Sequence, residues 1–115
     1  MVREQRFDGI RELDSGQLLH FYLTNLDGAA YAIPGGATVT FEAYLDGATT
    51  LTVDNTANVT VPTQTGDDIG HCYYTVQTDD FDGSSAGTYW CRMKVNTITS
   101  AEAKLIVKDE YSNGE

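Results

Sequence analysis

The stretch from residue 85 to residue 95 constrains the fold most, because a glycine turn leads directly into a strict alternation of two sets of side chains. One set is largely apolar and consists of Tyr89, Cys91, Met93 and Val95, whereas the other consists of Trp90, Arg92 and Lys94. A period of two with one apolar set is typical of a β-strand that covers a core with one face. Residues 87–95 are therefore predicted to form a strand whose first set is buried.

The same alternation recurs along most of the chain. Strands are predicted over residues 17–24, 37–44, 49–53, 59–61, 70–77, 87–95 and 100–107. Turn signals rich in glycine, proline, asparagine and aspartate separate them at intervals of about 8–12 residues. No segment has the period of an amphipathic helix. The pattern predicts an all-β chain, folded as a β-sandwich of about seven antiparallel strands.

The chain of 115 residues is long enough for one domain with its own core. Residues 1–16 fit neither period and are predicted to be an N-terminal arm or a first edge element; residues 17–107 form the sandwich, and residues 108–115 a polar C-terminal tail. No apolar run approaches the ~20 residues that span a bilayer, and the first residues lack the apolar centre of a secretory signal. We therefore expect synthesis in the cytoplasm.

The charge is strongly acidic and unevenly spread. The formal net charge is -10, and no basic residue lies between positions 12 and 91. Such a surface repels nucleic acid and anionic lipid, because phosphate binding requires lysine or arginine. We therefore predict neither a nucleic acid nor a membrane as partner. The acidic excess either serves solubility alone, which is the simpler explanation, or faces a basic partner.

Three arginines, Arg3, Arg6 and Arg11, stand in the first eleven positions, ahead of the acidic body. A basic arm laid on the acidic face of a neighbouring copy would gain many weak ion pairs in a repeated assembly. We therefore predict these arginines as partner-binding residues in a homo-oligomer or multi-copy assembly. The alternative is a disordered N-terminus that only aids solubility.

Cys72 and Cys91 both fall in the inward sets of their predicted strands. Counting ~3.3 Å per residue from the intervening loop places them at similar heights, so a disulfide between the two sheets is geometrically allowed. The alternative is a pair of buried free thiols, which the reducing cytoplasm favours. The spacing, without a Cys-x-x-Cys pair or a histidine cluster, argues against zinc.

The remaining polar residues form no recognisable catalytic or cofactor-binding constellation. His20 and His71 each lie in a strand beside aromatic residues and are predicted to be ordinary strand histidines. The acidic clusters at 67–68 and 79–83 flank one strand at opposite ends, ~30 Å apart, so they cannot share a calcium ion. They are predicted to be solvated turn residues. We therefore predict that the protein is not an enzyme, with no catalytic residue, no metal and no cofactor.

Two resemblances to known families follow from these motifs. Tyr89-Trp90-Cys91, after a Ser-Ala-Gly-Thr turn, resembles the tyrosine corner of immunoglobulin domains. The stronger resemblance, over about residues 16–107, is to the N-terminal immunoglobulin-like domain of phage baseplate upper proteins and related stand-alone phage virion proteins; it is carried by residues 23–28, 36–47, 73–76 and 86–91. It implies an immunoglobulin-like β-sandwich without an active site.

We therefore expect a non-enzymatic bacteriophage structural protein in the virion, either a capsid decoration (cement) protein or a baseplate or tail component, that binds other virion proteins. Tyr22, Tyr44 and Trp90 are the candidate anchors, because they are predicted to face outward and aromatic residues dominate interface energies. The alternative for each is cross-strand packing within its sheet. The alternative function is a carbohydrate-binding or adhesion module on a virion or cell surface, in which exposed aromatics stack on sugar rings.

Overall fold

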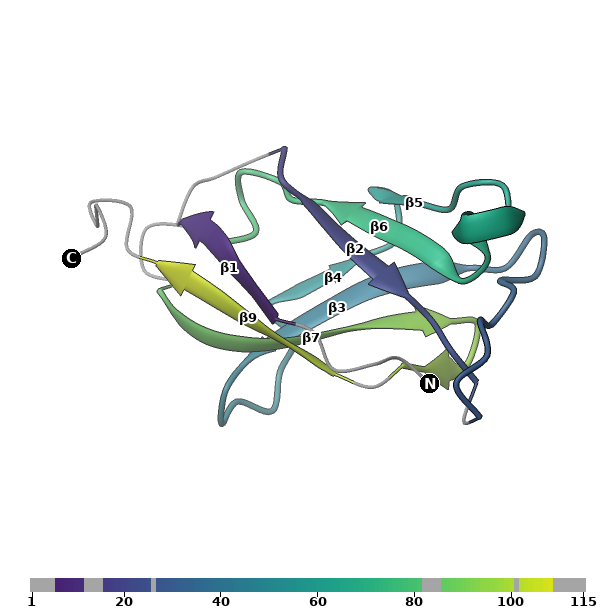
Figure 1. The fold of residues 1–115 in the computed structure, drawn as a ribbon. Helices are drawn as coiled ribbons and strands as arrows, with labels where there is room; N and C mark the ends of the chain where they lie inside the picture. Colours follow the sequence, from purple (N-terminus) through teal and green to yellow (C-terminus); the bar gives the residue numbers. More distant parts are fainter. Residues whose placement is uncertain (1–5, 12–15, 26, 82–85, 101, 109–115) are drawn as a thin grey trace.

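The computed structural model describes residues 6–11, 16–25, 27–81, 86–100 and 102–108, and for residues 6–11 the backbone alone. Its strands form two sheets that enclose one core (Figure 1). The larger sheet has the order β1 (Arg6–Arg11), β9 (Ala103–Lys108), β7 (Gly87–Val95), β3 (Val39–Leu45), β4 (Val53–Asn55), with β8 (Ile98–Thr99) paired to β7. The smaller sheet has the order β2 (Leu18–Tyr22), β6 (His71–Thr75), β5 (Val59–Thr60).

The connections between the strands make this an immunoglobulin-like β-sandwich. The chain crosses from one sheet to the other between β1 and β2, between β2 and β3, between β4 and β5, and between β6 and β7. The pairs β3–β4 and β5–β6 each stay within one sheet. Strand β1 runs parallel to β9, and the other paired strands are antiparallel. Two facing sheets with such crossovers are the architecture of immunoglobulin-like domains. The predicted fold class is confirmed.

The core lies where the period of two predicts it. In β7 the burial alternates from Thr88 to Val95, and Tyr89, Cys91, Met93 and Val95 are buried. The two sheets meet through aromatic contacts: the ring of Phe41 on β3 stacks on that of Tyr74 on β6, with the centroids 4.2 Å apart. Burial of these side chains supplies the main favourable free energy of folding.

The first edge of the larger sheet falls inside the predicted N-terminal arm. Strand β1 pairs in parallel with β9, with a shift in register between Phe7 and Ile10. Of the two alternatives for residues 1–16, the described part thus forms a first edge element. Arg3 and residues 109–115 of the predicted tail lie outside the described residues.

Two strand predictions were wrong in detail. The strand predicted over residues 49–53 is β4 at Val53–Asn55, because Val53 pairs with Ala43 and is buried, whereas residues 49–52 are exposed in a longer loop. The strand predicted over residues 100–107 is preceded by β8, which pairs with the end of β7. Asn96 makes the tight turn between β7 and β8 with a φ of 53°, in the left-handed region that asparagine tolerates.

The predicted acidic loop at residues 78–86 also contributes to the core. Phe81 is 1% exposed, and its ring meets that of Tyr89 edge to face with the centroids 5.0 Å apart. Asp80 is no solvated turn residue either, because its Oδ2 accepts hydrogen bonds from the Tyr74 hydroxyl at 2.5 Å and from the Gln77 amide at 2.9 Å. Desolvation and this bond to Asp80 raise the pKa of Tyr74. Asp80 and Phe81 therefore tie the described part of this loop to the sandwich.

Candidate functional site

Two of the three predicted aromatic anchors lie side by side on the outer face of the larger sheet. Tyr44 on β3 and Trp90 on β7 are partners in the register of these strands. Trp90 Nε1 donates to Asp46 Oδ1 at 2.9 Å, and the Tyr44 hydroxyl donates to Glu102 Oε2 at 2.5 Å. Both side chains are only half-buried. They are therefore cross-strand neighbours whose polar tips are bonded within the chain and whose rings still meet solvent.

An arginine between two carboxylates holds the centre of this face together. Arg92 Nε donates to Glu42 Oε1 at 2.8 Å, and Arg92 Nη1 donates to Glu102 Oε2 at 3.3 Å. The guanidinium carbon lies 5.8 Å from the centroid of the Tyr44 ring. Hydrogen bonding by Glu42 raises the pKa of Arg92, and the bond to Glu102 raises that of Tyr44. We name Glu42, Tyr44, Trp90, Arg92 and Glu102 the aromatic face.

A shallow hollow borders the aromatic face. It has a volume of about 300 Å³ and is lined by Tyr44, Arg92 and three residues of the β3–β4 loop, Ala48, Thr49 and Leu51. Leu51 is 37% exposed. Exposed apolar side chains beside half-exposed aromatic rings are typical of protein-binding surfaces.

The outer face of the smaller sheet brings the two histidines together. The register of β2 with β6 pairs Tyr22 with His71 and His20 with Tyr73. His20 Nδ1 lies 2.8 Å from His71 Nε2, and His71 Nδ1 lies 2.9 Å from Asp68 Oδ1. The Tyr22 ring stacks on that of His71 with the centroids 4.6 Å apart. Burial, and next the charge of His71, lower the pKa of His20.

Both histidines lie in strands beside aromatic residues, as predicted, and the structure adds a direct contact between them that does not have the geometry of a catalytic pair. An aspartate that orients a histidine resembles a general-base pair, which needs a nucleophile on the other imidazole nitrogen. Here that nitrogen faces the second imidazole. The two histidines are 51 residues apart in the chain, so only the strand pairing, which no local pattern encodes, could have indicated the contact.

The third predicted anchor, Tyr22, belongs to this second face and is 42% exposed. The predicted anchors therefore do not form one patch, because β2 lies in the smaller sheet while Tyr44 and Trp90 lie in the larger one. Two of the predicted partner-binding arginines are the first and last residues of the edge strand β1, Arg6 and Arg11.

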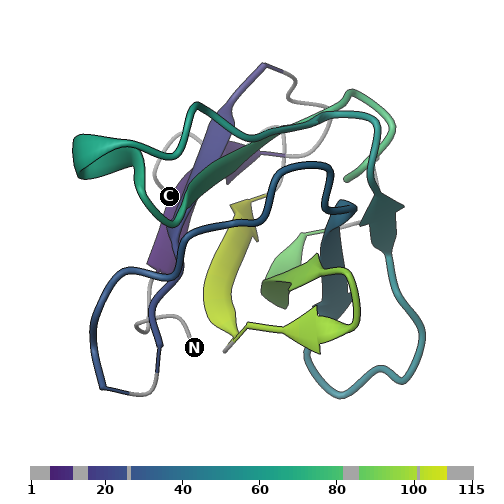
Figure 2. The same ribbon diagram turned by 90° about the vertical axis from the view of Figure 1, so that its right-hand side faces the viewer.

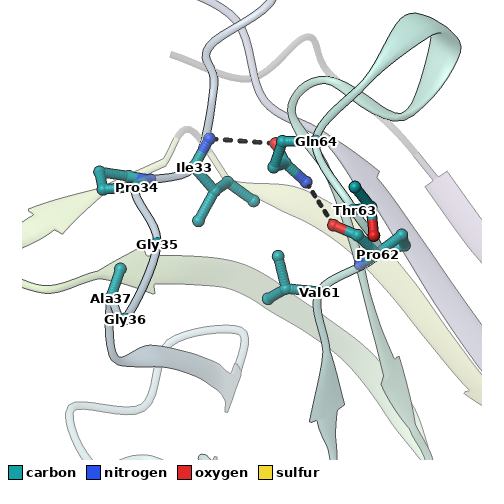
Figure 3. Close-up of a pocket in the computed structure, with 9 residues that line it drawn as sticks. All are labelled: Ile33, Pro34, Gly35, Gly36, Ala37, Val61, Pro62, Thr63 and Gln64. Carbon is teal, nitrogen blue, oxygen red and sulfur yellow. Dashed lines mark hydrogen bonds between the residues drawn. The ribbon is translucent and has the colours of Figure 1, made fainter.

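A hollow of about 360 Å³ lies at one end of the sandwich, between residues 33–37 and residues 61–64 (Figure 3). The amide group of Gln64, in the lining of this hollow, makes four hydrogen bonds to backbone groups. Gln64 Oε1 accepts from the amides of Ile33 at 3.0 Å and Gly70 at 2.7 Å. Gln64 Nε2 donates to the carbonyls of Pro62 at 3.0 Å and His71 at 3.1 Å. Gln64 thus serves as a structural link between loops.

Cys72 and Cys91 lie in different sheets, on β6 and β7, and both are fully buried free thiols. The structure therefore has a pair of buried free thiols and not the inter-sheet disulfide. The strands that carry the two cysteines, β6 and β7, are not paired with each other as a hairpin. Strand β6 pairs with β2 and β5, while β7 pairs with β3, β8 and β9. Burial raises the pKa of Cys72 to about 12 and also raises that of Cys91.

Within the described ranges, no group of three histidine, cysteine, aspartate or glutamate side chains is placed to hold a metal ion. The same ranges contain no helix long and apolar enough to cross a bilayer.

No protein-family model and no curated protein matches this chain. A solved structure from work on multimeric cell-adhesive interactions of VGSC beta subunits is similar to it at a TM-score of 0.42, with 16% sequence identity over 93% of each chain. The immunoglobulin-like assignment therefore depends on the sheet topology described above.

Proposed function

We propose that this protein is a non-enzymatic phage virion structural protein, a capsid decoration protein or a baseplate or tail component, that binds another virion protein through its aromatic face. The observation that carries the proposal is the Tyr44–Trp90 pair, whose rings are half-exposed although their polar tips are bonded to Glu102 and Asp46. Rings held in place before binding lose little conformational entropy on binding, and aromatic residues are the commonest anchors of interfaces.

The use of the polar groups supports a binding role over a catalytic one. Arg92 is neutralised by Glu42 and Glu102, and the imidazole of His71 is occupied by Asp68 and His20. Each of these groups serves the sheet itself. The virion location comes from the resemblance of residues 16–107 to phage immunoglobulin-like domains.

The test is direct binding to virion proteins. The purified chain is mixed with each capsid and tail protein encoded beside it, and complexes are detected by size-exclusion chromatography with light scattering. We expect Trp90→Ala to weaken the complex about 30-fold, the effect of losing an anchor worth about 2 kcal/mol, while the thermal melt stays cooperative. The matched control is Tyr22→Ala, which removes an exposed aromatic from the opposite sheet. Absence of any complex, or loss only in the Tyr22 variant, contradicts the proposal.

The hollow beside Tyr44 favours a second candidate, a carbohydrate-binding or adhesion module. Its volume of about 300 Å³, with Tyr44 and Arg92 in its lining, offers a ring for stacking and an adjacent cation. Binding of the chain to a glycan array, lost in Tyr44→Ala and kept in Tyr22→Ala, would replace the virion proposal with this one.

A further inference from the structure

The basic residues gather in one part of the fold. All those in the described ranges lie in three strands that are adjacent in the larger sheet, β1, β9 and β7; they are Arg6, Arg11, Arg92, Lys94, Lys104 and Lys108. Apart from Arg3, which lies outside the described residues, the rest of this chain, of net charge -10, contains no lysine or arginine. Residues from both ends of the sequence therefore build a single cationic region.

The backbone register places several of these residues opposite one another on neighbouring strands. Lys104 pairs with Arg6 on one side and with Trp90 on the other, and Lys108 pairs with Arg11. Like charges on directly opposite residues of neighbouring strands destabilise a sheet. Arg92 is paired with Glu42 and Glu102, whereas the outward-facing lysines have no ion pair in the described part of the chain. We name Lys94, Lys104 and Lys108 the basic strip.

The basic strip runs beside the aromatic face. On β9, Lys104 and Lys108 are four residues apart, about 13 Å along the strand. Lys94 stands four residues from Trp90, the partner of Lys104, on β7. Outward-facing cations that have no ion pair with the described residues attract a surface that offers carboxylates.

The same molecule carries an acidic surface in another place. The 3₁₀ helix η1 (Gly66–Asp68) presents Asp67 and Asp68, both exposed, and the turn after β2 presents the exposed Asp27. A hollow of about 400 Å³ lies between this helix and this turn. In Figure 1, η1 is at the right of the molecule and contacts β6 of the smaller sheet, whereas β7 and β9, which carry the basic strip, belong to the larger sheet; Figure 2 shows the end that carries η1.

We propose that the basic strip binds the η1 surface of a second copy of this chain. The inference rests on the proposed function, which it deepens by naming a partner in a multi-copy assembly. The two surfaces differ and lie apart, so the contact is head to tail and repeats into a ring or filament. At physiological ionic strength charges are screened beyond ~8 Å, so local ion pairs outweigh the repulsion between two acidic molecules.

The test uses charge reversal and sedimentation velocity of the full chain at concentrations up to about 1 mM, the weak limit of specific complexes. We expect self-association that weakens at least about tenfold when NaCl rises from about 0.15 M to about 1 M, where the screening length falls to ~3 Å. Lys104→Glu with Lys108→Glu, and separately Asp67→Lys, should each weaken it at least about tenfold. Asp54→Lys, which has the same charge change as Asp67→Lys at an exposed position of β4, is the matched control for that variant and should leave self-association unchanged.

Mixing the two defective variants gives the sharpest outcome. The Asp67→Lys chain keeps an intact basic strip, and the double lysine variant keeps an intact η1 surface. Their mixture should associate again, because the basic strip of the first variant meets the intact η1 surface of the second, and the two altered surfaces carry opposite charges. Wild-type protein that stays monomeric, association that ignores both reversals, or a mixture that stays monomeric would overturn the inference. Binding to a virion protein without self-association refutes this inference alone, whereas self-association without virion binding refutes the proposed function alone.

Discussion

His20 Nδ1 lies 2.8 Å from His71 Nε2, and the other nitrogen of His71 lies 2.9 Å from Asp68 Oδ1. With both imidazoles neutral, His71 Nδ1 donates to Asp68, and His20 Nδ1 donates to His71 Nε2. Full protonation of both would set one N–H against the other and break this line of hydrogen bonds. The outer face of the smaller sheet is therefore sensitive to acid.

This contact predicts that stability falls as the pH drops. Burial and the charge of His71 hold the pKa of His20 below its ordinary value of about 6.5, so the unfolded chain binds more protons near that pH. The contribution is fully present above pH ~6.5 and decreases below it. Urea unfolding between pH ~8 and ~5 should show a smaller decrease for His20→Gln than for the wild type. Identical slopes for the two proteins would contradict the prediction.

Removing the amide of Gln64 should be costly, because Gln64 makes hydrogen bonds to Ile33, Pro62, Gly70 and His71. Gln64→Leu leaves two donors and two acceptors of the backbone without that partner, and we expect a loss of about 2–4 kcal/mol in the free energy of unfolding. Gln77→Leu, which removes one bond to the nearby Thr75 carbonyl, is the control and should cost about 1 kcal/mol. Equal losses in urea titrations would show that Gln64 is not a special link.

Gly70 has no room for a side chain. Its φ is +86°, and a Cβ placed on it would lie 2.5 Å from the Leu23 carbonyl oxygen. Gly36 has a similar φ of +78° but open space around it, so Gly36→Ala should cost only the left-handed strain of about 1–2 kcal/mol. Gly70→Ala should cost at least about 2 kcal/mol more. Thermal and urea unfolding of the two variants compare the steric effect directly, and similar losses would be inconsistent with the close contact.

The Arg92–Glu42 pair should show strong coupling. Glu42 is only 8% exposed, so Arg92→Leu leaves a nearly buried carboxylate with no cation at 2.8 Å. We expect a loss of about 2–3 kcal/mol, below the range for fully buried pairs because the Arg92 side chain is partly exposed. Changing Glu42→Leu as well should restore most of that loss, and a double-mutant cycle measures the coupling. A double variant as unstable as the sum of the single variants would argue against the pair.

The buried thiols should be inert in the folded protein. With the pKa of Cys72 raised to about 12, almost no thiolate forms at pH ~8, and Cys91 is as deeply buried. A thiol reagent should label neither cysteine in the native state and both after unfolding in guanidinium without reductant. Cys72→Ser, with one remaining thiol, calibrates the signal. If the unfolded wild type gives no signal, the inter-sheet disulfide that the sequence allowed has formed.

The local patterns predicted most of the secondary structure, since the alternation in β2, β3 and β7 reports directly which side chains face inward. They failed to predict strand limits and buried side chains that depend on contacts between distant segments. Strand β4 begins at Val53 because that side chain is buried in the core and pairs with Ala43. Phe81, although it lies in an acidic loop, packs on Tyr89. Both choices are made by burial between distant segments.

By itself, the sequence determined the all-β class, the inward sets of the long strands and the inward direction of both cysteines, because side chains alternate with a period of two in any extended strand. The tertiary structure alone decided which strands are neighbours. That choice joins His20 to His71, sets Tyr44 beside Trp90 and brings Arg6 next to Lys104. Strand pairing depends on hydrogen bonds and burial between segments far apart in the chain, so no local pattern encodes it.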